Sequence, residues 1–308
     1  MSESKFVELQ KEIFHLFEQE KYNKVHSLIE KVQEEFPERL DKTIFWKACV
    51  YSKQGNPQKA IAVLEEGLNK GIWWNPLTLI YDEDLRNLQS IEKFKMIVNR
   101  CQEILNNLKS TSKPQLFIYG NDKSNTGIFS LHWRGSNVKD FAPYWFDNEL
   151  LDQFLFGFPQ SSQIFGYNAY CWDNKDIAVE EITTLFKRFK EKYNTKQEII
   201  AGASQGGRLA IELSLYGNIL ETKGFIAVIP SIQNVAAFEN LINENKKVIK
   251  GYIITGDKDS FYNNVVELVK IFEKNNYQCR LIVKEGLGHF FPKDFTDLLK
   301  EAIEFVIS

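Results

Sequence analysis

The sequence is poor in cysteine. Its 308 residues include four, Cys49, Cys101, Cys171 and Cys279, and no two of them form a CxxC pair. Such wide spacing is typical of reduced thiols and argues against both a disulfide framework and a zinc site. We therefore expect a protein without a metal and without a cofactor.

The sequence also lacks any long uncharged apolar run, and its first residues, Met1 to Phe6, show no basic leader followed by an apolar stretch. We expect no membrane span and a cytoplasmic location. The net charge is −3 at pH 7, with Lys and Arg scattered along the chain, which argues against nucleic acid as a partner. The length and the 44% of hydrophobic residues allow two domains.

The most informative motif lies within residues 198–210, where an apolar strand breaks into a GxSxG turn and resumes as a helix-forming segment. A serine on so sharp a turn needs unusual backbone angles, and the glycines two residues before and after it remove side chains that would collide. We therefore predict Ser204 as the nucleophile of a nucleophile elbow. The alternative is an ordinary turn serine, which the flanking strand and helix disfavour.

Two later segments, 248–255 and 280–283, are predicted strands that open into loops carrying Asp257, Asp259 and His289. A serine nucleophile needs an imidazole to take its proton, and the imidazole needs a carboxylate on its other nitrogen. We predict His289 as the base and Asp259 as the acid, with Asp257 as its rival and a structural core histidine as the alternative for His289. The order serine, acid, histidine is the one that α/β hydrolases use.

The oxyanion of an acyl-transfer reaction needs two N–H donors, and the residue after the nucleophile, Gln205, supplies the first through its backbone. Residues 131–137, LHWRGSN, resemble the LHGxGxN loop of the phospholipase/carboxylesterase group of α/β hydrolases, relatives of the acyl-protein thioesterases. Residues 202–210, GASQGGRLA, resemble the GFSQGG elbow of that group. The resemblance covers about two-thirds of the chain, and it implies the backbone N–H of Arg134 as the second donor; His132 is predicted to be structural.

Trp133 departs from the pattern of that group, which has glycine at this position. The large indole leaves open a catalytically impaired scaffold that binds a ligand or a protein. Trp133, Trp172 and Phe291 are candidates to line the substrate pocket, although aromatic side chains of this kind also fit a core. The resemblance implies a serine hydrolase acting on a small-molecule ester or thioester; a prolyl oligopeptidase-like peptidase remains the other enzyme alternative.

The first hundred or so residues lack strand-like runs and carry apolar residues at helical spacing. Residues 20–25 parallel residues 55–60, and the offset from Val25 to Ala60 is 35 residues, close to the roughly 34-residue period of tetratricopeptide repeats. We predict a helical, tetratricopeptide-like domain over 1–112, with a plain helical bundle as the alternative. It is expected to pack on the α/β domain, with Trp73 and Trp74 as candidates for that contact, and to offer a surface for a peptide or protein partner.

After the polar stretch 109–114, the predicted domain boundary, strands and helices alternate through residues 113–308. This alternation predicts an α/β domain with a mostly parallel sheet, helices on both faces and the reactive loops at the carboxyl ends of the strands. Residues 115–120 and 127–131 are predicted to pair as a hairpin across 121–125.

Overall fold

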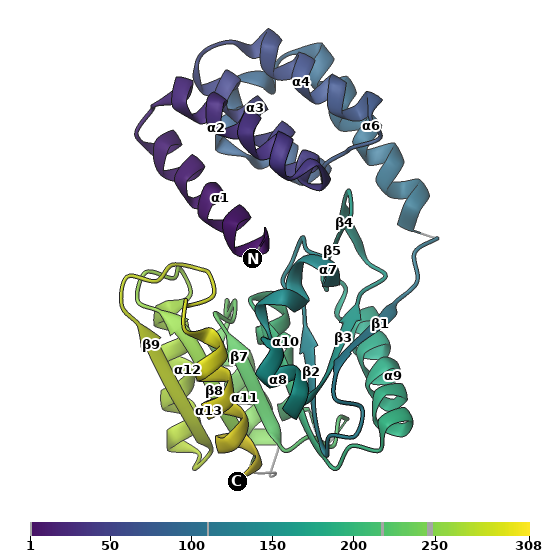
Figure 1. Ribbon diagram of the computed structural model, residues 1–308, viewed down its shortest axis with the longest axis vertical. Helices are drawn as coiled ribbons and strands as arrows, with labels where there is room; N and C mark the ends of the chain where they lie inside the picture. Colours follow the sequence, from purple (N-terminus) through teal and green to yellow (C-terminus); the bar gives the residue numbers. More distant parts are fainter. Residues whose placement is uncertain (1, 110, 217–218, 245–248) are drawn as a thin grey trace. The chain divides into compact units, whose positions relative to one another are not determined.

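The computed structural model describes residues 2–109, 111–216, 219–244 and 249–308 (Figure 1). Two compact units divide the chain. The helical unit comprises Met1–Thr111 together with Ile164–Tyr167, and the sheet unit comprises Ser112–Gln163 and Asn168–Ser308. Ser110, within the predicted boundary, and Val248, the first residue of a predicted strand, lie outside the described residues.

The helical unit confirms the prediction of an all-helical N-terminal region. Within the part of the chain that the structure describes, no helix is both long enough and apolar enough to cross a membrane. Besides the short strand β4 (Ile164–Gly166), the unit contains α1 (Ser2–Glu18), α2 (Tyr22–Glu35), η1 (Pro37–Arg39), α3 (Leu40–Lys53), α4 (Pro57–Asn69), α5 (Pro76–Tyr81), η2 (Glu83–Leu88) and α6 (Glu92–Lys109).

Helical spacing explains the core of this unit, because residues three and four apart lie on one face of a helix. In α2 the buried residues Val25, Ile29 and Val32 follow this spacing. Trp73 and Trp74 are 4% and 8% exposed and belong to the same apolar core. The Trp74 ring lies so close to Gly67 that an added Cβ there would be 2.5 Å from it. Both tryptophans therefore pack inside the helical unit.

The sheet unit confirms the predicted α/β architecture. Its seven-stranded sheet has the order β1-β3-β2-β6-β7-β8-β9, and β1 is antiparallel to β3 while the other neighbouring pairs run parallel. The main strands are β1 (Gln115–Gly120), β2 (Thr126–Leu131), β3 (Leu155–Gln160), β6 (Gln197–Ala203), β7 (Gly224–Val228), β8 (Lys250–Gly256) and β9 (Gln278–Lys284). The remaining elements are α7 (Val138–Phe141), η3 (Ala142–Tyr144), α8 (Asn148–Gln153), β5 (Ala169–Tyr170), α9 (Lys175–Tyr193), α10 (Gln205–Leu215), α11 (Val235–Glu244), α12 (Tyr262–Lys274) and α13 (Phe295–Ile307).

The predicted hairpin between β1 and β2 is wrong. Strand β3 lies between them, pairing antiparallel with β1 and parallel with β2. All six residues of β2 are buried, and its second edge is occupied by β6. A strand buried on both faces is typical of the interior of a parallel sheet, so β2 is a central strand and β1 is the edge.

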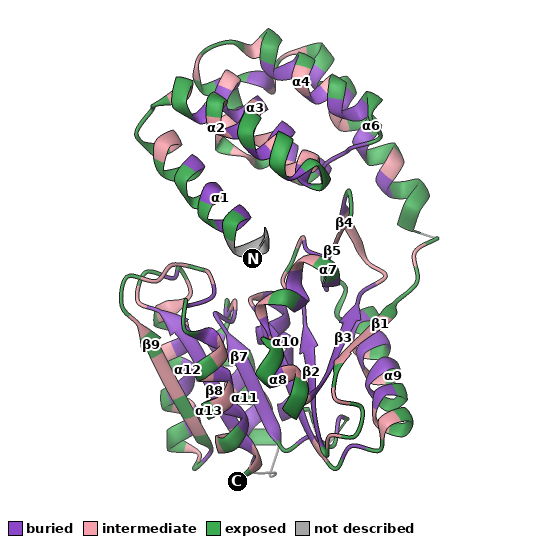
Figure 2. Cartoon of the chain, viewed as in Figure 1, coloured by how far each residue is buried: buried purple, intermediate pink, exposed green. Residues whose placement is uncertain are grey.

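Alternate residues along the central strands enter different cores, as the two-residue period of a strand requires. Phe129, Ile200 and Ala227 belong to the core that α9, α10, α11 and α12 cover. Ile128 and Ile199 belong to the opposite core, under α7, α8 and α13. Figure 2 shows these central strands as buried. The two covered faces leave the carboxyl ends of the strands as the place where polar loops gather.

Candidate active site

Ser204 lies at the turn between β6 and α10 with φ 53° and ψ −115°, a conformation that residues other than glycine rarely adopt. Close contacts explain both glycines of the motif. A Cβ on Gly202 would be 2.4 Å from the backbone of Gly206, and a Cβ on Gly206 would be 2.1 Å from the carbonyl oxygen of Leu131. The turn therefore has the close packing of a nucleophile elbow, directly beside the end of β2.

The His289 ring lies between Ser204 and Asp259. Its Nε2 is 2.7 Å from the Ser204 Oγ, and its Nδ1 is 2.9 Å from Oδ2 of Asp259. The loop of His289 reaches this position because Gly256, the last residue of β8, closely approaches it: a Cβ on Gly256 would be 1.9 Å from the carbonyl oxygen of Leu287. The structure thus joins three side chains from three separate strand ends by hydrogen bonds.

The two rival carboxylates have different partners. Asp259, whose side chain is not exposed, accepts a hydrogen bond from the Phe261 N–H through Oδ1 and faces His289 with Oδ2. Asp257 accepts a hydrogen bond of 2.7 Å from the N–H of Gly286, at the start of the histidine loop. Asp259 is therefore placed to orient the imidazole, whereas Asp257 holds the backbone of the same loop.

His132 is fully buried in the loop after β2 and holds the peptide that carries the N–H of Arg134. Its Nδ1 is 2.8 Å from the carbonyl oxygen of Trp133, and its Nε2 is 3.4 Å from the N–H of Ser161. Because the Ser161 N–H donates to Nε2, that nitrogen is unprotonated and the ring proton of neutral His132 lies on Nδ1. Because a trans peptide points its N–H away from its carbonyl, this bond fixes the direction of the Arg134 N–H.

The Trp133 indole is accommodated by neighbouring aromatic rings. Its ring centroid lies 5.1 Å from that of Phe141, 5.5 Å from Tyr144 and 5.8 Å from Phe291. Trp133 is not among the described residues with positive φ, whereas Gly135, two residues later, has φ 76°. The loop therefore makes its left-handed turn at Gly135 and needs no glycine at position 133.

The other two pocket candidates are almost completely buried. Trp172 is 1% exposed, stacks on His132 with a centroid distance of 4.7 Å, and donates its indole N–H to the carbonyl oxygen of His132. Phe291 is 5% exposed and belongs to the core under α13. In the structure, Trp172 supports the loop after β2 and Phe291 supports the aromatic cluster around Trp133.

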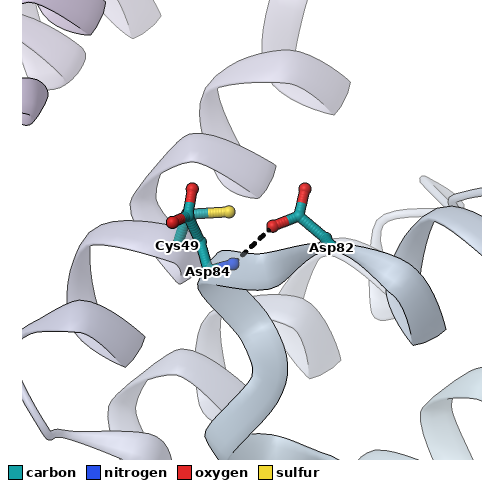
Figure 3. A group of neighbouring side chains, drawn as sticks. All are labelled: Cys49, Asp82 and Asp84. Atoms are coloured by element: carbon teal, nitrogen blue, oxygen red, sulfur yellow. Dashed lines mark hydrogen bonds between the residues drawn. The ribbon is translucent and has the colours of Figure 1, made fainter.

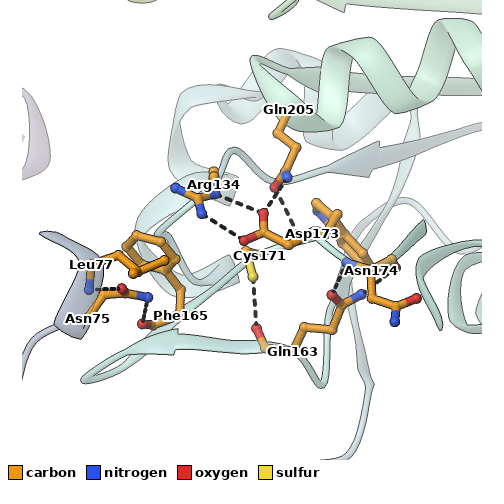
Figure 4. Close-up of polar contacts among 10 residues, drawn as sticks. Asn75, Leu77, Arg134, Gln163, Phe165, Cys171, Asp173, Asn174 and Gln205 are labelled. Carbon is orange, nitrogen blue, oxygen red and sulfur yellow. Dashed lines mark hydrogen bonds and ion pairs between the residues drawn. The ribbon is translucent and has the colours of Figure 1, made fainter. Parts of the chain in front are cut away.

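Sequence reasoning missed two acidic residues that hold the loops of this site. Glu181, on α9, accepts hydrogen bonds from the Ser161 hydroxyl and from the N–H of Ser162. Asp173 bonds to the side chains of Arg134 and Gln205 (Figure 4). Neither residue belongs to a sequence motif. Glu181 is one of several charged residues of α9, and Asp173 is a polar residue just before that helix begins.

Among the described residues, one group has the composition of a metal site: Cys49, Asp82 and Asp84, whose potential ligand atoms lie within 4.8 Å of one another (Figure 3). Burial, followed by the two nearby carboxylates, raises the pKa of the Cys49 thiol, so the thiolate needed as a ligand is disfavoured. Asp82 accepts the N–H of Asp84 and caps η2, and Asp84 pairs with Lys53 at 3.5 Å. These contacts give both carboxylates a structural role.

Comparison with known proteins finds one family profile and several solved structures that resemble this chain. The sequence profile of the family described as A/B hydrolase-like, N-terminal domain, matches residues 5–109. No curated protein matches the chain. A crystal structure of an uncharacterized protein from Bacillus cereus ATCC 10987 is 27% identical, with a TM-score of 0.55, over 98% of this chain and 99% of that one.

Two further crystal structures match a part of the chain. Esterase PE8 is 19% identical with a TM-score of 0.52, over 62% of this chain and 99% of its own. A phospholipase/carboxylesterase from Dyadobacter fermentans DSM 18053 is 20% identical with a TM-score of 0.45, over 63% of this chain and 97% of its own. The likeness to esterase PE8 is one of fold. The chain therefore combines a helical region that matches the A/B hydrolase-like N-terminal profile with a sheet unit that has the fold of esterase PE8.

Proposed function

We propose that this protein is a serine hydrolase that cleaves a carboxylic ester or thioester through an acyl-serine intermediate. The observation that carries the proposal is the His289 ring, which bonds to the Ser204 hydroxyl on one side and to Asp259 on the other. Donation of the Nδ1 proton to Asp259 leaves Nε2 as an acceptor for the Ser204 hydroxyl, which is the tautomer that base catalysis needs.

In the first half of the reaction, the Ser204 oxygen attacks the carbonyl carbon while its proton passes to Nε2 of His289. The buried Asp259 carboxylate stabilises the imidazolium that forms. When the tetrahedral intermediate collapses, the bond to the leaving group breaks and the departing alcohol or thiol takes the proton from Nε2. A water molecule then attacks the acyl-serine by the same proton transfers, releases the carboxylic acid and restores the Ser204 hydroxyl.

The oxyanion is bound by the backbone N–H groups of Gln205 and Arg134. Gln205 is the first residue of α10, where amides have no partner within the helix, and the helix dipole adds a partial positive charge there. The Arg134 amide is directed by the bond between His132 and the Trp133 carbonyl. Since neighbouring rings accommodate the Trp133 indole, the loop keeps an ordered backbone, which supports turnover over the alternative of an inactive scaffold.

A fluorophosphonate probe and p-nitrophenyl acetate test the proposal. Wild-type protein is expected to be labelled and to hydrolyse the ester, and Ser204→Ala is expected to lose labelling and about 10⁴-fold to 10⁶-fold in kcat, as removal of a triad member does. The matched control is Ser214→Ala, on α10, because the Ser214 hydroxyl donates to the Ala210 carbonyl within the same helix. Equal labelling of wild type and Ser204→Ala would contradict the proposal.

Substrate class is tested by comparing p-nitrophenyl esters and thioesters with aminoacyl-naphthylamides on the same preparation. We expect hydrolysis of the first two and little release of naphthylamine, because the phospholipase/carboxylesterase-like motifs lie at both the elbow and the loop after β2. Preferred cleavage of the amides would instead favour a peptidase. We also propose a reducing compartment, since all four cysteines are free thiols.

A further inference from the structure

Asp173 lies between the side chains of the two residues whose backbone amides bind the oxyanion in the proposed mechanism. Arg134 donates to it through two nitrogens, Nε to Oδ1 at 2.8 Å and Nη2 to Oδ2 at 2.7 Å, and Gln205 donates through Nε2 to Oδ1 at 2.8 Å (Figure 4). One carboxylate therefore connects the loop after β2 to the start of α10.

The orientation of each partner is defined by a further contact. The Arg134 pair is bidentate, a geometry that fixes the plane of the guanidinium against the carboxylate. The Oε1 atom of Gln205 accepts the N–H of Trp172 at 2.9 Å, so its amide nitrogen is the group that faces Asp173. Neither side chain can rotate without breaking a charge-assisted hydrogen bond.

The chain segment that carries Asp173 is itself attached to the loop. The Gly135 N–H donates to the Tyr170 carbonyl at 2.8 Å, and the Tyr170 N–H donates to the Ser136 carbonyl at 2.7 Å. The Trp172 indole donates to the His132 carbonyl at 3.0 Å. Asp173 thus extends a set of bonds that holds the segment 170–173 along the loop, and together with the Trp172 N–H it links that segment to Gln205 at the start of α10.

We propose that Asp173 is a positioning residue for the oxyanion hole: its carboxylate keeps the Arg134 and Gln205 backbone amides at a fixed separation. This inference rests on the proposed function. Catalysis by preorganised donors depends on their position relative to the developing oxyanion, so a looser pair of amides lowers transition-state stabilisation without removing either donor.

The solvent exposure of Arg134 and Asp173 distinguishes a role in positioning the oxyanion hole from a role in folding stability. The side chains of Arg134 and Asp173 are 47% and 43% exposed. The hydrogen bonds from Arg134, the largest cause, lower the pKa of Asp173, so the group is an anion at neutral pH. Exposed ion pairs contribute little to folding stability because water and salt screen them. Loss of the carboxylate is therefore expected to change the reaction much more than the stability.

The test compares Asp173→Asn with wild type and with the control Asp176→Asn, an exposed aspartate in the first turn of α9. For Asp173→Asn we expect kcat to fall about tenfold to a hundredfold, short of complete loss of one donor, with KM changed by less than about threefold. Fluorophosphonate labelling is expected to slow by a similar factor. Asp176→Asn is expected to match wild type in all three measurements.

A trifluoromethyl ketone supplies a readout that a structural role would not move, because it adds to the Ser204 oxygen and places an oxyanion in the hole. Its inhibition constant is expected to rise about tenfold or more in Asp173→Asn, in step with the fall in kcat. Arg134→Lys, which keeps the charge but cannot form the bidentate pair, is expected to change kcat in the same direction by less.

These measurements distinguish failure of the positioning role of Asp173 from failure of the proposed function. If wild-type protein is not labelled by the fluorophosphonate, the serine hydrolase assignment fails. If wild type is labelled and Asp173→Asn reacts and binds the ketone as Asp176→Asn does, the positioning role of Asp173 is wrong. A fall in kcat for Asp173→Asn with an unchanged inhibition constant for the ketone would also overturn it.

Discussion

At Ser204, a single residue holds an unfavourable backbone conformation because its neighbours leave no alternative. Positive φ at a residue other than glycine costs of the order of 1–3 kcal/mol. The Ser204 N–H donates to the Val228 carbonyl at 2.9 Å, and its carbonyl accepts the Arg208 and Ser231 N–H groups at 2.9 and 3.1 Å. These three bonds fix the turn from both sides, so the side chain stays directed at His289.

His132 is expected to make the folding stability depend on pH, because burial lowers its pKa from 6.5 to about 4. Between these pH values the unfolded chain binds a proton that the folded chain does not, so the free energy of unfolding decreases as the pH falls through this window. One pKa unit corresponds to about 1.4 kcal/mol, and the loss is therefore about 2 to 3 kcal/mol between pH 6.5 and 4.5.

The variant His132→Asn isolates this contribution, since its amide retains a donor near the Trp133 carbonyl but does not titrate. Urea unfolding of both proteins is measured at pH 7.5 and 4.5. Wild type is expected to lose about 2 to 3 kcal/mol more than the variant on acidification, while other titrating groups cancel in the difference. A difference that stays constant with pH would show that His132 titrates normally in the folded state.

Whether a residue of the site could be predicted from the sequence depends on whether neighbouring residues or only tertiary contacts define its position. Ser204, Asp259 and His289 each follow a predicted strand, and parallel strands bring their carboxyl ends to one edge of the sheet. Their proximity therefore followed from local patterns and topology. Asp173 reaches Arg134 across 39 residues and Gln205 across 32. No local pattern marks a side chain whose partners are defined only by tertiary structure.

At the scale of elements, two turns of the helical unit repeat in detail. After α1 the Glu20 N–H bonds to the Phe17 carbonyl and the Lys21 N–H to Leu16; after α3 the Gly55 N–H bonds to Ser52 and the Asn56 N–H to Tyr51. Glu20 and Gly55 have φ of 56° and 72°. Both turns thus have the same helix-ending pattern with one left-handed residue, at positions 35 residues apart. The sequence parallel of residues 20–25 with 55–60 therefore corresponds to a structural one.

Because both turns need a residue with positive φ, introducing glycine at position 20 and removing it at position 55 are expected to change stability in opposite directions. Glu20→Gly is expected to stabilise the pair α1–α2 by up to about 1 kcal/mol, because glycine adopts positive φ without the steric cost of a side chain. Gly55→Ala is expected to destabilise α3–α4 by about 1 kcal/mol, although nothing lies within 4 Å of the added Cβ. Amide hydrogen exchange of these helices measures both changes.

Glu20→Ala is the control for the first substitution, because alanine removes the carboxylate but keeps the Cβ that causes the strain. It is expected to change the exchange rates of α1 and α2 much less than Glu20→Gly does. If Glu20→Ala and Glu20→Gly stabilise the helices equally, the effect comes from the lost side chain and the backbone explanation is wrong.

Element pairing was less predictable than element type. The short polar segment 121–125 allows a hairpin between β1 and β2, which is why the sequence favoured one. The competing partner, β3, begins at Leu155 and forms hydrogen bonds with both strands. Burial of every residue of β2 requires neighbours on both edges, and the sequence of β2 alone does not identify them. Local patterns therefore gave the strands but not their order.

At the scale of the whole molecule, the chain passes between its two units three times. Besides the connection after Thr111, the short segment 164–167 groups with the helical unit although its neighbours Gln163 and Asn168 belong to the sheet unit. Asn75 holds this segment by donating its side-chain N–H to the Phe165 carbonyl at 2.7 Å, and the Tyr167 N–H donates to the Trp73 carbonyl at 3.3 Å. The helical unit is therefore completed by residues from a distant part of the sequence.

The Asn75 side chain both accepts and donates a hydrogen bond, and one substitution removes the donor while it keeps the acceptor. Its Oδ1 caps α5 by accepting the Leu77 N–H at 2.9 Å, while its Nδ2 binds Phe165. Asn75→Asp keeps the cap, since aspartate is an equally good N-cap, but replaces the donor by an oxygen that faces the Phe165 carbonyl. Loss of this hydrogen bond, with two oxygens left facing each other, is expected to cost about 1–3 kcal/mol, seen as faster amide exchange at Tyr167 and lower stability of the helical unit.

Asn56→Asp is a matched control for this change, because Asn56 also precedes a proline at the start of a helix, α4. The Asn56 side chain is exposed and donates to the nearby Gln54 carbonyl at 3.4 Å. A negative charge at a helix N-terminus is favourable, so this variant is expected to be as stable as wild type or slightly more so. If both variants behave alike, the bond from Asn75 to Phe165 does not hold the segment 164–167. If only Asn75→Asp speeds exchange at Tyr167 and leaves α5 protected, the segment 164–167 is part of the folded helical unit and the bond from Asn75 to Phe165 contributes to holding it.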